Sequence, residues 1–572
     1  MTADLSALER YRPVLVPRSA EDAPAAVRGW RPSEGLALFL LSLGVYLVVA
    51  TEMLHRRIIF ADALAREANA YYVLFSRDPH LPAVGFVWNP LPSLLLLPIL
   101  PLRHFFPALV RDGFAGNLES AVLMAGTVVL LASCLRKLVL RRAPRLVLVA
   151  LFALHPMILI YGANGQSEAV LLFFLLLTVN ALLGWLRDQR PGQLVTVGLG
   201  LGLGYLSRYE AVAPALAVTG LVGGVTAFGG AGNRSRRLRL ALNDMALVGL
   251  PFAFAFGLWA VSSQVLVKSW FPTFTSDYGN SAQVSGAQRF ISEATGTTHL
   301  AAVEYAARQL AGVQPFLFVL LIAVAVLAVR RRDRLALAAP VVLGAVLVFN
   351  NLAFLAGSSF GWLRFQLAAV PLAVLLAGTL VRLLTTATVD RSPQPGPRRW
   401  IRGLAVPMVL LAVAAALPVS VRTLTDHALA REETEAMLAT LAPGLANDKD
   451  RKYLDIFRTE QQVAADIDAM RLPDSSVLTD LAYAFPTLLA SDRLTQFVIT
   501  SDRDFKQILA DPVRGGVRYL LVPEPARAPS DALQRSRPNL YETGAGIARP
   551  VRTWSGSAGR GDWRLLELNL RR

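Results

Sequence analysis

Residues 136–190 read RKLVLRRAPRLVLVALFALHPMILIYGANGQSEAVLLFFLLLTVNALLGWLRDQR, and this stretch decides the fold class. It holds two apolar runs, 146–162 and 168–186, joined by a short polar segment and bounded on the far sides by arginine-rich clusters. A membrane-spanning helix needs roughly 20 mostly apolar residues. Basic residues collect in the cytoplasmic loops of membrane proteins. The stretch therefore predicts two antiparallel spans whose connection faces away from the cytoplasm.

The composition of the whole chain agrees with a multi-pass membrane protein. Of its 572 residues 54% are hydrophobic and only 17% charged, whereas soluble domains have about 25% charged residues. The net charge of +16 belongs to the first 421 residues, because residues 422–572 hold 21 basic and 21 acidic side chains. This excess lies between apolar runs, which indicates membrane topology and no nucleic-acid partner. The single cysteine, Cys134, excludes an intrachain disulfide.

Eleven apolar runs qualify as spans: 35–53, 117–135, 146–162, 168–186, 193–207, 211–229, 242–265, 312–329, 335–356, 366–381 and 403–421. Basic clusters occupy every second connection: 136–145, 187–190, 234–239, 330–334 and 391–402. The positive-inside rule then places the polar tail 1–34 in the cytoplasm, and the first span acts as an uncleaved signal anchor. We expect residues 35–421 to form the catalytic membrane domain of a cell (plasma or inner) membrane protein, with long outer loops at 54–116 and 266–311.

One further apolar segment, Asn89–Leu102, is too short and too rich in proline for a span. We interpret it as an interfacial or re-entrant helix.

An odd number of spans places residues 422–572 outside the cytoplasm. Helical periodicity covers Arg451–Met470, and short apolar runs follow at 476–479, 496–499 and 517–522 with helix-like stretches between them. This alternation favours an α/β unit with a partly parallel sheet. We expect residues 425–572 to form a separable domain that does not carry a chemical step.

Ionisable side chains at the outer ends of the spans are the candidate site residues, because such groups are costly near a membrane. They are Asp62, Glu67, His80, Glu168, Arg208, Glu210 and Arg364. Each also has a structural interpretation: Asp62 and Glu168 suit helix starts, Arg208 and Glu210 form a local pair, and Arg364 suits lipid headgroups. His80 suits an ordinary loop. Glu67 follows Asp62 by five residues, so at 100° per residue it points well away from it.

These residues resemble the pattern of the GT-C superfamily of membrane glycosyltransferases, which includes the aminoarabinose transferases and protein O-mannosyltransferases. The relatives have an acidic residue in a long first outer loop followed by a proline-rich helix, and FADALAREANAYY and FVWNPLPSLLLLP resemble those two elements. NGQSEAVLLFFLLL and WLRFQLAAVPLAVLLA resemble the acidic and basic starts of later spans. The resemblance implies an all-α polytopic membrane domain of about 11 helices with a C-terminal extracytoplasmic α/β domain.

The resemblance also implies the chemistry. The donor is a sugar on a polyprenyl phosphate, and the acceptor is a glycan, lipid or protein of the cell envelope. Asp62 takes the position of the general base in an inverting displacement, Arg364 and Arg208 bind the phosphate, and Glu168, Glu67 and His80 contact substrate. Ala63 follows Asp62 where many relatives have a second acid, which argues against a metal-dependent mechanism. A divalent metal ion is a possible cofactor, and no cofactor is required. The alternative function is a transporter or flippase of lipid-linked sugars, although inverted repeats, common among transporters, are not evident.

Overall fold

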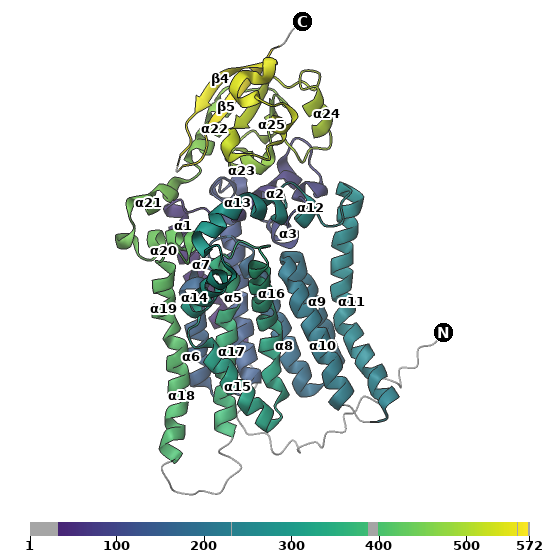
Figure 1. The fold of residues 1–572 in the computed structure, drawn as a ribbon, viewed down its shortest axis with the longest axis vertical. Helices are drawn as coiled ribbons and strands as arrows, with labels where there is room; N and C mark the ends of the chain where they lie inside the picture. The colour runs from purple at the N-terminus through teal and green to yellow at the C-terminus, as the bar shows by residue number, and fades with distance from the viewer. Residues whose placement is uncertain (1–31, 230–231, 387–397, 558, 570–572) are drawn as a thin grey trace.

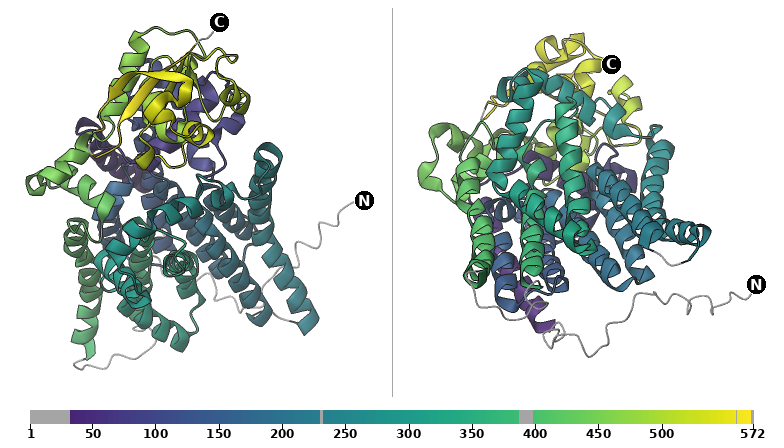
Figure 2. Two further views of the ribbon diagram at one scale, coloured as in Figure 1. Left: turned by 45° about the horizontal axis from the view of Figure 1, so that its top comes forward. Right: turned by 60° about the horizontal axis from the view of Figure 1, so that its bottom comes forward.

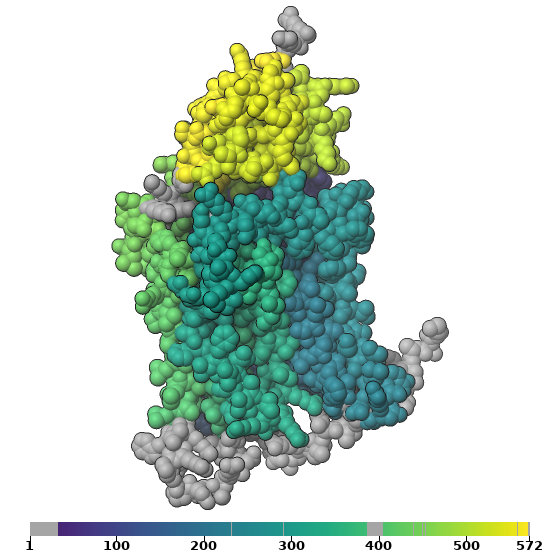
Figure 3. Space-filling view, in the orientation of Figure 1, coloured from purple at the N-terminus to yellow at the C-terminus, as the bar shows by residue number. Residues whose placement is uncertain are grey.

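The computed structural model describes residues 32–229, 232–386, 398–557 and 559–569. Helices running side by side form the body of the molecule, and a small sheet caps one end (Figure 1). The same two layers are visible in the rotated views of Figure 2 and in the space-filling view of Figure 3. The expected cytoplasmic tail 1–34 and the basic cluster 391–402 lie mostly outside the described residues.

The helices of the body are α1 (Pro32–His55), α5 (Phe114–Lys137), α6 (Arg142–Ala153), α7 (Pro156–Tyr161), α8 (Glu168–Asp188), α9 (Pro191–Ser207), α10 (Val212–Gly229), α11 (Arg234–Val267), α14 (His299–Val313), α15 (Leu317–Arg331), α16 (Ala345–Leu355), α17 (Ala369–Thr386), α18 (Arg398–Ala414) and α19 (Ala416–Leu424). Within the described residues, eight helical stretches are long and apolar enough to cross a membrane, or nine if α14 and α15, bent by 80°, form one broken span. Helices occupy all eleven expected spans. However, α9 and the consecutive helices α6 and α7 are each too short to be counted among the helices long enough to cross a membrane. The count of eleven therefore stays a prediction.

Burial distinguishes central from peripheral helices. Most of the side chains of α8 and α17 are buried, whereas α11 exposes Leu250, Phe254 and Leu258. Apolar side chains on an outer face are stable only against lipid, so α11 belongs to the membrane-facing rim. The outer ends of α8 and α17 are consequently fixed positions around which a site can be built.

The outer loops consist of short helices that lie between the body and the sheet (Figure 1). They are α2 (Ala61–Phe75), η3 (Leu81–Val84), α3 (Leu91–Leu96), η4 (Leu100–His104), α4 (Ala108–Arg111), α12 (Pro272–Thr275) and α13 (Asn280–Thr295). Because α3 has only six residues and gives way to further short turns, the segment Asn89–Leu102 does not form a span. The sequence prediction for this segment is confirmed in that respect.

The C-terminal region contains a five-stranded sheet in the order β2-β1-β3-β5-β4. Its elements are α20 (Arg431–Thr440), α21 (Asp448–Lys452), α22 (Arg458–Ala469), β1 (Val477–Leu478), α23 (Leu481–Ala490), β2 (Phe497–Val498), α24 (Phe505–Ala510), β3 (Tyr519–Pro523), α25 (Ala532–Ser536), α26 (Leu540–Thr543), β4 (Ala548–Trp554) and β5 (Trp563–Leu568). Strands β1, β2 and β3 are parallel, as predicted, and β5 and β4 add antiparallel to them. The sequence analysis missed both β4 and β5. Residues 549–553 of β4 are exposed on an edge strand and give no apolar run.

The sheet and the first outer loop share one hydrophobic core. Leu64, Tyr71 and Leu96 of the loop belong to the same buried cluster as residues of α22, α23 and the strands, such as Leu488 and Phe497. Ion pairs reinforce this junction, among them one between Asp78 and the exposed Arg503. A core divided between two chain segments argues against the expectation of a separable domain.

Residues 425–572 expressed alone should therefore fail to form a monodisperse folded domain. The isolated segment leaves its half of the shared core exposed, and about 25 cal/mol of stabilisation is lost for each Å² of apolar surface left in water. Size-exclusion chromatography together with binding of a hydrophobic dye checks this expectation. A monomer that melts cooperatively and binds no dye would contradict it.

A second junction joins loop 266–311 to the sheet region through a buried carboxylate. The Tyr278 hydroxyl donates to Asp480 Oδ2 at 2.6 Å and to the Ser530 carbonyl at 3.1 Å. Asp531, next to Ser530, is fully buried, and its Oδ1 accepts from the backbone N–H of Gln534 at the start of α25. Burial, together with the nearby charge of Asp480, raises the pKa of Asp531 to about 7. This junction is consequently sensitive to pH.

Because the folded-state pKa of Asp531 lies above its ordinary value, the folded state binds the proton more tightly and loses stability as the pH rises from about 4 to about 7. Asp531→Asn keeps the acceptor oxygen at the helix start and removes the titration. Its unfolding temperature should exceed that of the wild type by a margin that grows over this range, corresponding to a few kcal/mol. Intrinsic-fluorescence melting of both proteins at pH 5 and pH 8 measures the margin, and an equal margin at the two pH values would disprove the assignment.

Candidate active site

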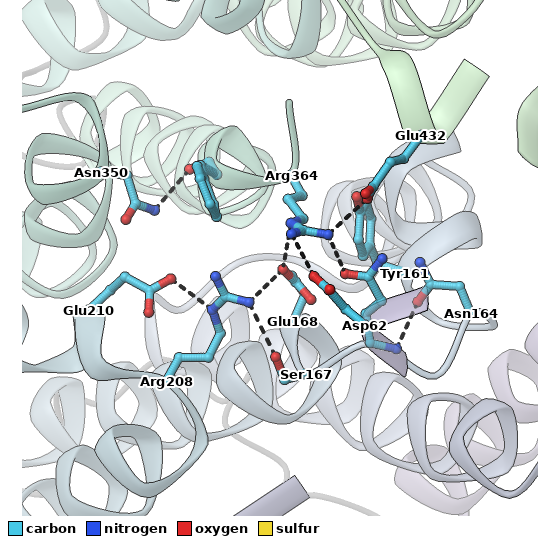
Figure 4. Close-up of polar contacts among 12 residues, drawn as sticks. Asp62, Tyr161, Asn164, Ser167, Glu168, Arg208, Glu210, Asn350, Arg364 and Glu432 are labelled. Carbon is cyan, nitrogen blue, oxygen red and sulfur yellow. Dashed lines mark hydrogen bonds and ion pairs between the residues drawn. The ribbon is translucent and has the colours of Figure 1, made fainter. Parts of the chain in front are cut away.

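Arg364 is the centre of a cluster of charged side chains at the outer ends of the spans (Figure 4). It lies in the short helix η8 (Leu363–Gln366), just before α17. Its Nη2 donates to Asp62 Oδ2 at 2.8 Å, and its Nη1 donates at 2.8 Å to both Glu432 Oε2 and Gln166 Oε1. The guanidinium thus connects its own chain segment with three others.

Arg208 forms the second half of the cluster (Figure 4). It is the C-terminal cap of α9 and donates to Glu168 Oε1 and to Glu210 Oε1, both at 2.7 Å. Glu168 Oε1 is also 3.6 Å from the Nε of Arg364. One carboxylate oxygen therefore lies between two buried arginines. Glu168 is the first residue of α8, where the helix dipole also favours a negative charge.

The cluster lines a cavity of about 80 Å³. Its walls are formed by Asp62, Arg66, Val87, Trp88, Asn89, Ser207, Arg208, Tyr209, Glu210, Thr273, Asn280, Gln283, Phe360, Arg364 and Phe365. The side chain of Asp62 is 43% exposed, in contrast to 5% for Glu168, so Asp62 is the more accessible of the two carboxylates. Thr273, Asn280 and Gln283 of loop 266–311 form part of its wall.

A second cavity adjoins the first on the side of the spans. It shares Arg208, Glu210 and Arg364 with the first cavity but is walled by Leu171, Leu172, Leu175, Val346, Leu367 and Ala368. Its volume is about 20 Å³, room for about one water molecule.

Two candidates from the sequence lie elsewhere. Glu67 is fully buried on the opposite side of α2 and accepts from the backbone N–H of Gly116 at 3.0 Å. His80 caps η3 and contacts Asp78, which pairs with Arg503. Neither lines the cavity, so their substrate-binding roles remain predictions that the geometry does not support.

Comparison with known proteins adds to this geometry. The family model described as dolichyl-phosphate-mannose-protein mannosyltransferase matches residues 103–259. The apo crystal structure of ArnT from Cupriavidus metallidurans is similar over 94% of this chain and 98% of its own, with 15% identity and a TM-score of 0.51. The chain has the GT-C fold of membrane glycosyltransferases. The resemblance inferred from the sequence is thereby confirmed.

Two other structures are more distant. The archaeal oligosaccharyltransferase AglB from Archaeoglobus fulgidus, in complex with an inhibitory peptide and a dolichol-phosphate, matches 85% of this chain and 69% of its own with 10% identity and a TM-score of 0.38. The arabinofuranosyltransferase AftD from Mycobacteria matches 93% of this chain and 40% of its own with 13% identity and a TM-score of 0.40. Neither likeness is close enough to carry an argument. No curated protein sequence matches the chain significantly.

The acidic residues of this cluster do not fit a divalent metal ion. Among the residues that the structure describes, no group of three or more His, Cys, Asp or Glu side chains is arranged to hold one. The carboxylates of Asp62, Glu168, Glu210 and Glu432 are directed at arginines instead.

Sequence reasoning missed two residues of the site. Glu432 follows the last span and starts α20, in the region that we expected to have no part in the chemistry. Arg66 lies on α2 four residues after Asp62, a spacing that places both side chains on one helix face. The spacing of Asp62 and Arg66 can be seen in the sequence FADALAREANAYY. The position of Glu432 cannot, because it depends on how the chain returns from the last span to the cavity.

Proposed function

We propose that this protein is an integral-membrane glycosyltransferase that moves a sugar from a polyprenyl-phosphate donor to an extracytoplasmic acceptor with inversion at the anomeric carbon. The observation that carries the proposal is the cavity itself. It combines an accessible carboxylate, Asp62, with a cluster of arginines. The GT-C fold supports the same reaction class. The sugar, the acceptor and the extracytoplasmic orientation are part of the proposal.

In this reaction Asp62 acts as the general base. The acceptor hydroxyl transfers its proton to Asp62 while its oxygen bonds to the anomeric carbon. The bond from that carbon to the phosphate oxygen breaks, and polyprenyl phosphate leaves. The ion pair with Arg364 holds the Asp62 carboxylate in place at the cavity wall, so the base is oriented before the acceptor arrives.

The arginines stabilise the leaving group. Charge on the phosphate grows as the glycosidic bond breaks, and a guanidinium matches phosphate oxygens in two-point contacts. Arg208 donates from Nη1 to Glu168 and from Nε to Glu210, so it serves chiefly to hold Glu168. Arg364 contributes to phosphate binding when Glu432 releases its Nη1.

Asp62→Asn should reduce turnover by about a hundredfold or more, because it removes the basic group and keeps the shape. The matched control is Glu67→Gln, the same chemical change one and a half turns along α2. Burial raises the pKa of Glu67 well above its usual range, so glutamine resembles its neutral state and turnover should stay within a few-fold. Release of polyprenyl phosphate from a lipid-linked sugar measures both. Equal loss in the two variants, or movement of the intact donor across vesicles without release, would contradict the proposal.

Glu432 gives the donor affinity a dependence on pH. Burial raises the pKa of Glu432 to about 7, with Arg364 opposing the shift. As the pH rises through 7, Glu432 becomes charged and competes more strongly for Arg364. The apparent KM for the donor should therefore rise by roughly fivefold or more between pH 6 and pH 8, at the lower end of ordinary coupling energies of about 1–3 kcal/mol.

Glu432→Gln should abolish that rise and keep the KM at its low-pH value. Its control is the adjacent Glu433→Gln, because Glu433 accepts from the Tyr161 hydroxyl at 2.6 Å and does not contact Arg364. Initial-rate kinetics at three pH values compare the two variants. A pH dependence that survives in Glu432→Gln would disprove the competition.

A further inference from the structure

Arg66 is a buried arginine at the wall of the cavity. Its side chain comes from α2, and the residue is only 9% exposed. Its guanidinium carbon lies 4.7 Å from the centre of the Trp88 ring. Its Nη1 is buried and has no hydrogen-bond partner among the described residues, and no ion pair of Arg66 occurs there.

The other two arginines of the cavity differ from it in this respect. Arg208 pairs with Glu168 and Glu210, and Arg364 pairs with Asp62 and Glu432. Burial lowers the pKa of Arg66 only to about 10, so the side chain stays charged at neutral pH. The carboxylates of Asp62 and Glu168 favour its charged form from a distance, but neither forms an ion pair with it among the described residues, and a stacked tryptophan compensates for burial of the charge only in part. Arg66 is therefore the arginine of the cavity wall that, within the described residues, has no direct partner for its charge.

We propose that Arg66 is the first binding partner of the phosphate group of the lipid-linked donor. The phosphate would lie in the cavity, against the guanidinium at its wall. The inference rests on the proposed glycosyltransferase function, because it assigns a ligand to the same cavity. A sugar phosphodiester on a prenyl chain carries one negative charge, which matches the one unpaired cation.

Two features of the surroundings favour a lipid phosphate over a soluble one. Aliphatic side chains of α8 and α16, among them Leu172 and Val346, lie beside Arg208 and Arg364 at the outer ends of the spans, where the prenyl chain of a membrane lipid would approach. Arg66 also lies one turn beyond Asp62 on α2, with the Cβ atoms of such pairs roughly 5–6 Å apart. A phosphate on Arg66 would therefore present its glycosidic carbon near the base.

We expect the loss of Arg66 and the loss of Arg364 to change different kinetic constants. Arg66 already lacks an internal partner, so it gains the same contact in the bound donor and in the transition state. Loss of such uniform binding raises KM and leaves kcat nearly unchanged. Arg364 must first release Glu432, so its contribution grows as the phosphate charge grows, and its loss lowers kcat.

The test compares Arg66→Met, Arg66→Lys and Arg103→Ala with the wild type in lipid nanodiscs. Methionine retains an unbranched side chain against Trp88 without the charge, and lysine retains the charge without the planar fork. Arg103 is a control from the same outer loop, where it stacks on Phe75 at 4.5 Å away from the cavity. The readouts are donor KM and kcat, binding of polyprenyl phosphate, uncharged polyprenol and inorganic phosphate, and the melting temperature without ligand.

In Arg66→Met, donor KM and the dissociation constant for polyprenyl phosphate should rise about ten- to hundredfold, with kcat within threefold of the wild type. Polyprenol binding should not change. Arg66→Lys should recover part of the affinity, and Arg103→Ala should behave like the wild type. The melting temperature of ligand-free Arg66→Met should equal or exceed that of the wild type, because the variant removes an unpaired buried charge. A structural role would lower it.

Four results would overturn the assignment. They are an unchanged KM in Arg66→Met, equal weakening of polyprenol and polyprenyl phosphate, a lower melting temperature in the ligand-free variant, and stronger stabilisation by inorganic phosphate than by polyprenyl phosphate. If the wild type transfers sugar and Arg66→Met has the same donor KM as the wild type, this inference alone is refuted. Binding of polyprenyl phosphate through Arg66, without sugar transfer to any acceptor, would refute the proposed function alone.

Discussion

The organisation of the site depends on one buried carboxylate, that of Glu168. Two arginines from different helices approach its Oε1, Arg208 at 2.7 Å and Arg364 at 3.6 Å. Removal of one partner from such a buried group leaves an uncompensated charge and destabilises a protein by about 3–5 kcal/mol. Glu168 therefore fixes the distance between the ends of α9 and α17. That distance in turn fixes the reach of Arg364 to Asp62 and Glu432.

The span pattern and the cluster were predictable because both follow from local constraints. Apolar runs between arginine-rich loops locate the helices, and the rarity of charge at their ends singles out Glu168, Arg208 and Arg364. The sequence places these residues on one side of the membrane, and the structure brings them into contact. The orientation toward the outside remains a prediction, since it rests on the charge rule alone. The side chains that the sequence assigned wrongly or missed depend instead on tertiary packing.

Glu67 illustrates that limit. Its composition resembles that of Asp62, yet its position on α2 directs it into the buried interface with α5, where the Gly116 N–H binds it. The edge strand β4 illustrates another limit, because an exposed strand has no apolar alternation to detect. The shared core of α2 and the sheet illustrates a third. Each half is amphipathic by itself, and no local pattern reveals that the two halves cover each other.

That shared core also determines how the site is assembled. Asp62 and Arg66 belong to α2, which is packed against the sheet region, whereas Glu168, Arg208 and Arg364 belong to the ends of the membrane helices. The cavity therefore lies at the joint between an outer layer and a membrane layer. Across this joint the charged contacts of the cluster converge on Arg364, through Asp62 from one side and Glu432 from the other. Glu432 lies on α20, whose residues Ala436 and Met437 belong to the core of the membrane helices. A phosphate that displaced Glu432 from Arg364 would therefore leave the ion pair of Arg364 with Asp62, the contact by which α2 reaches the membrane layer, in place.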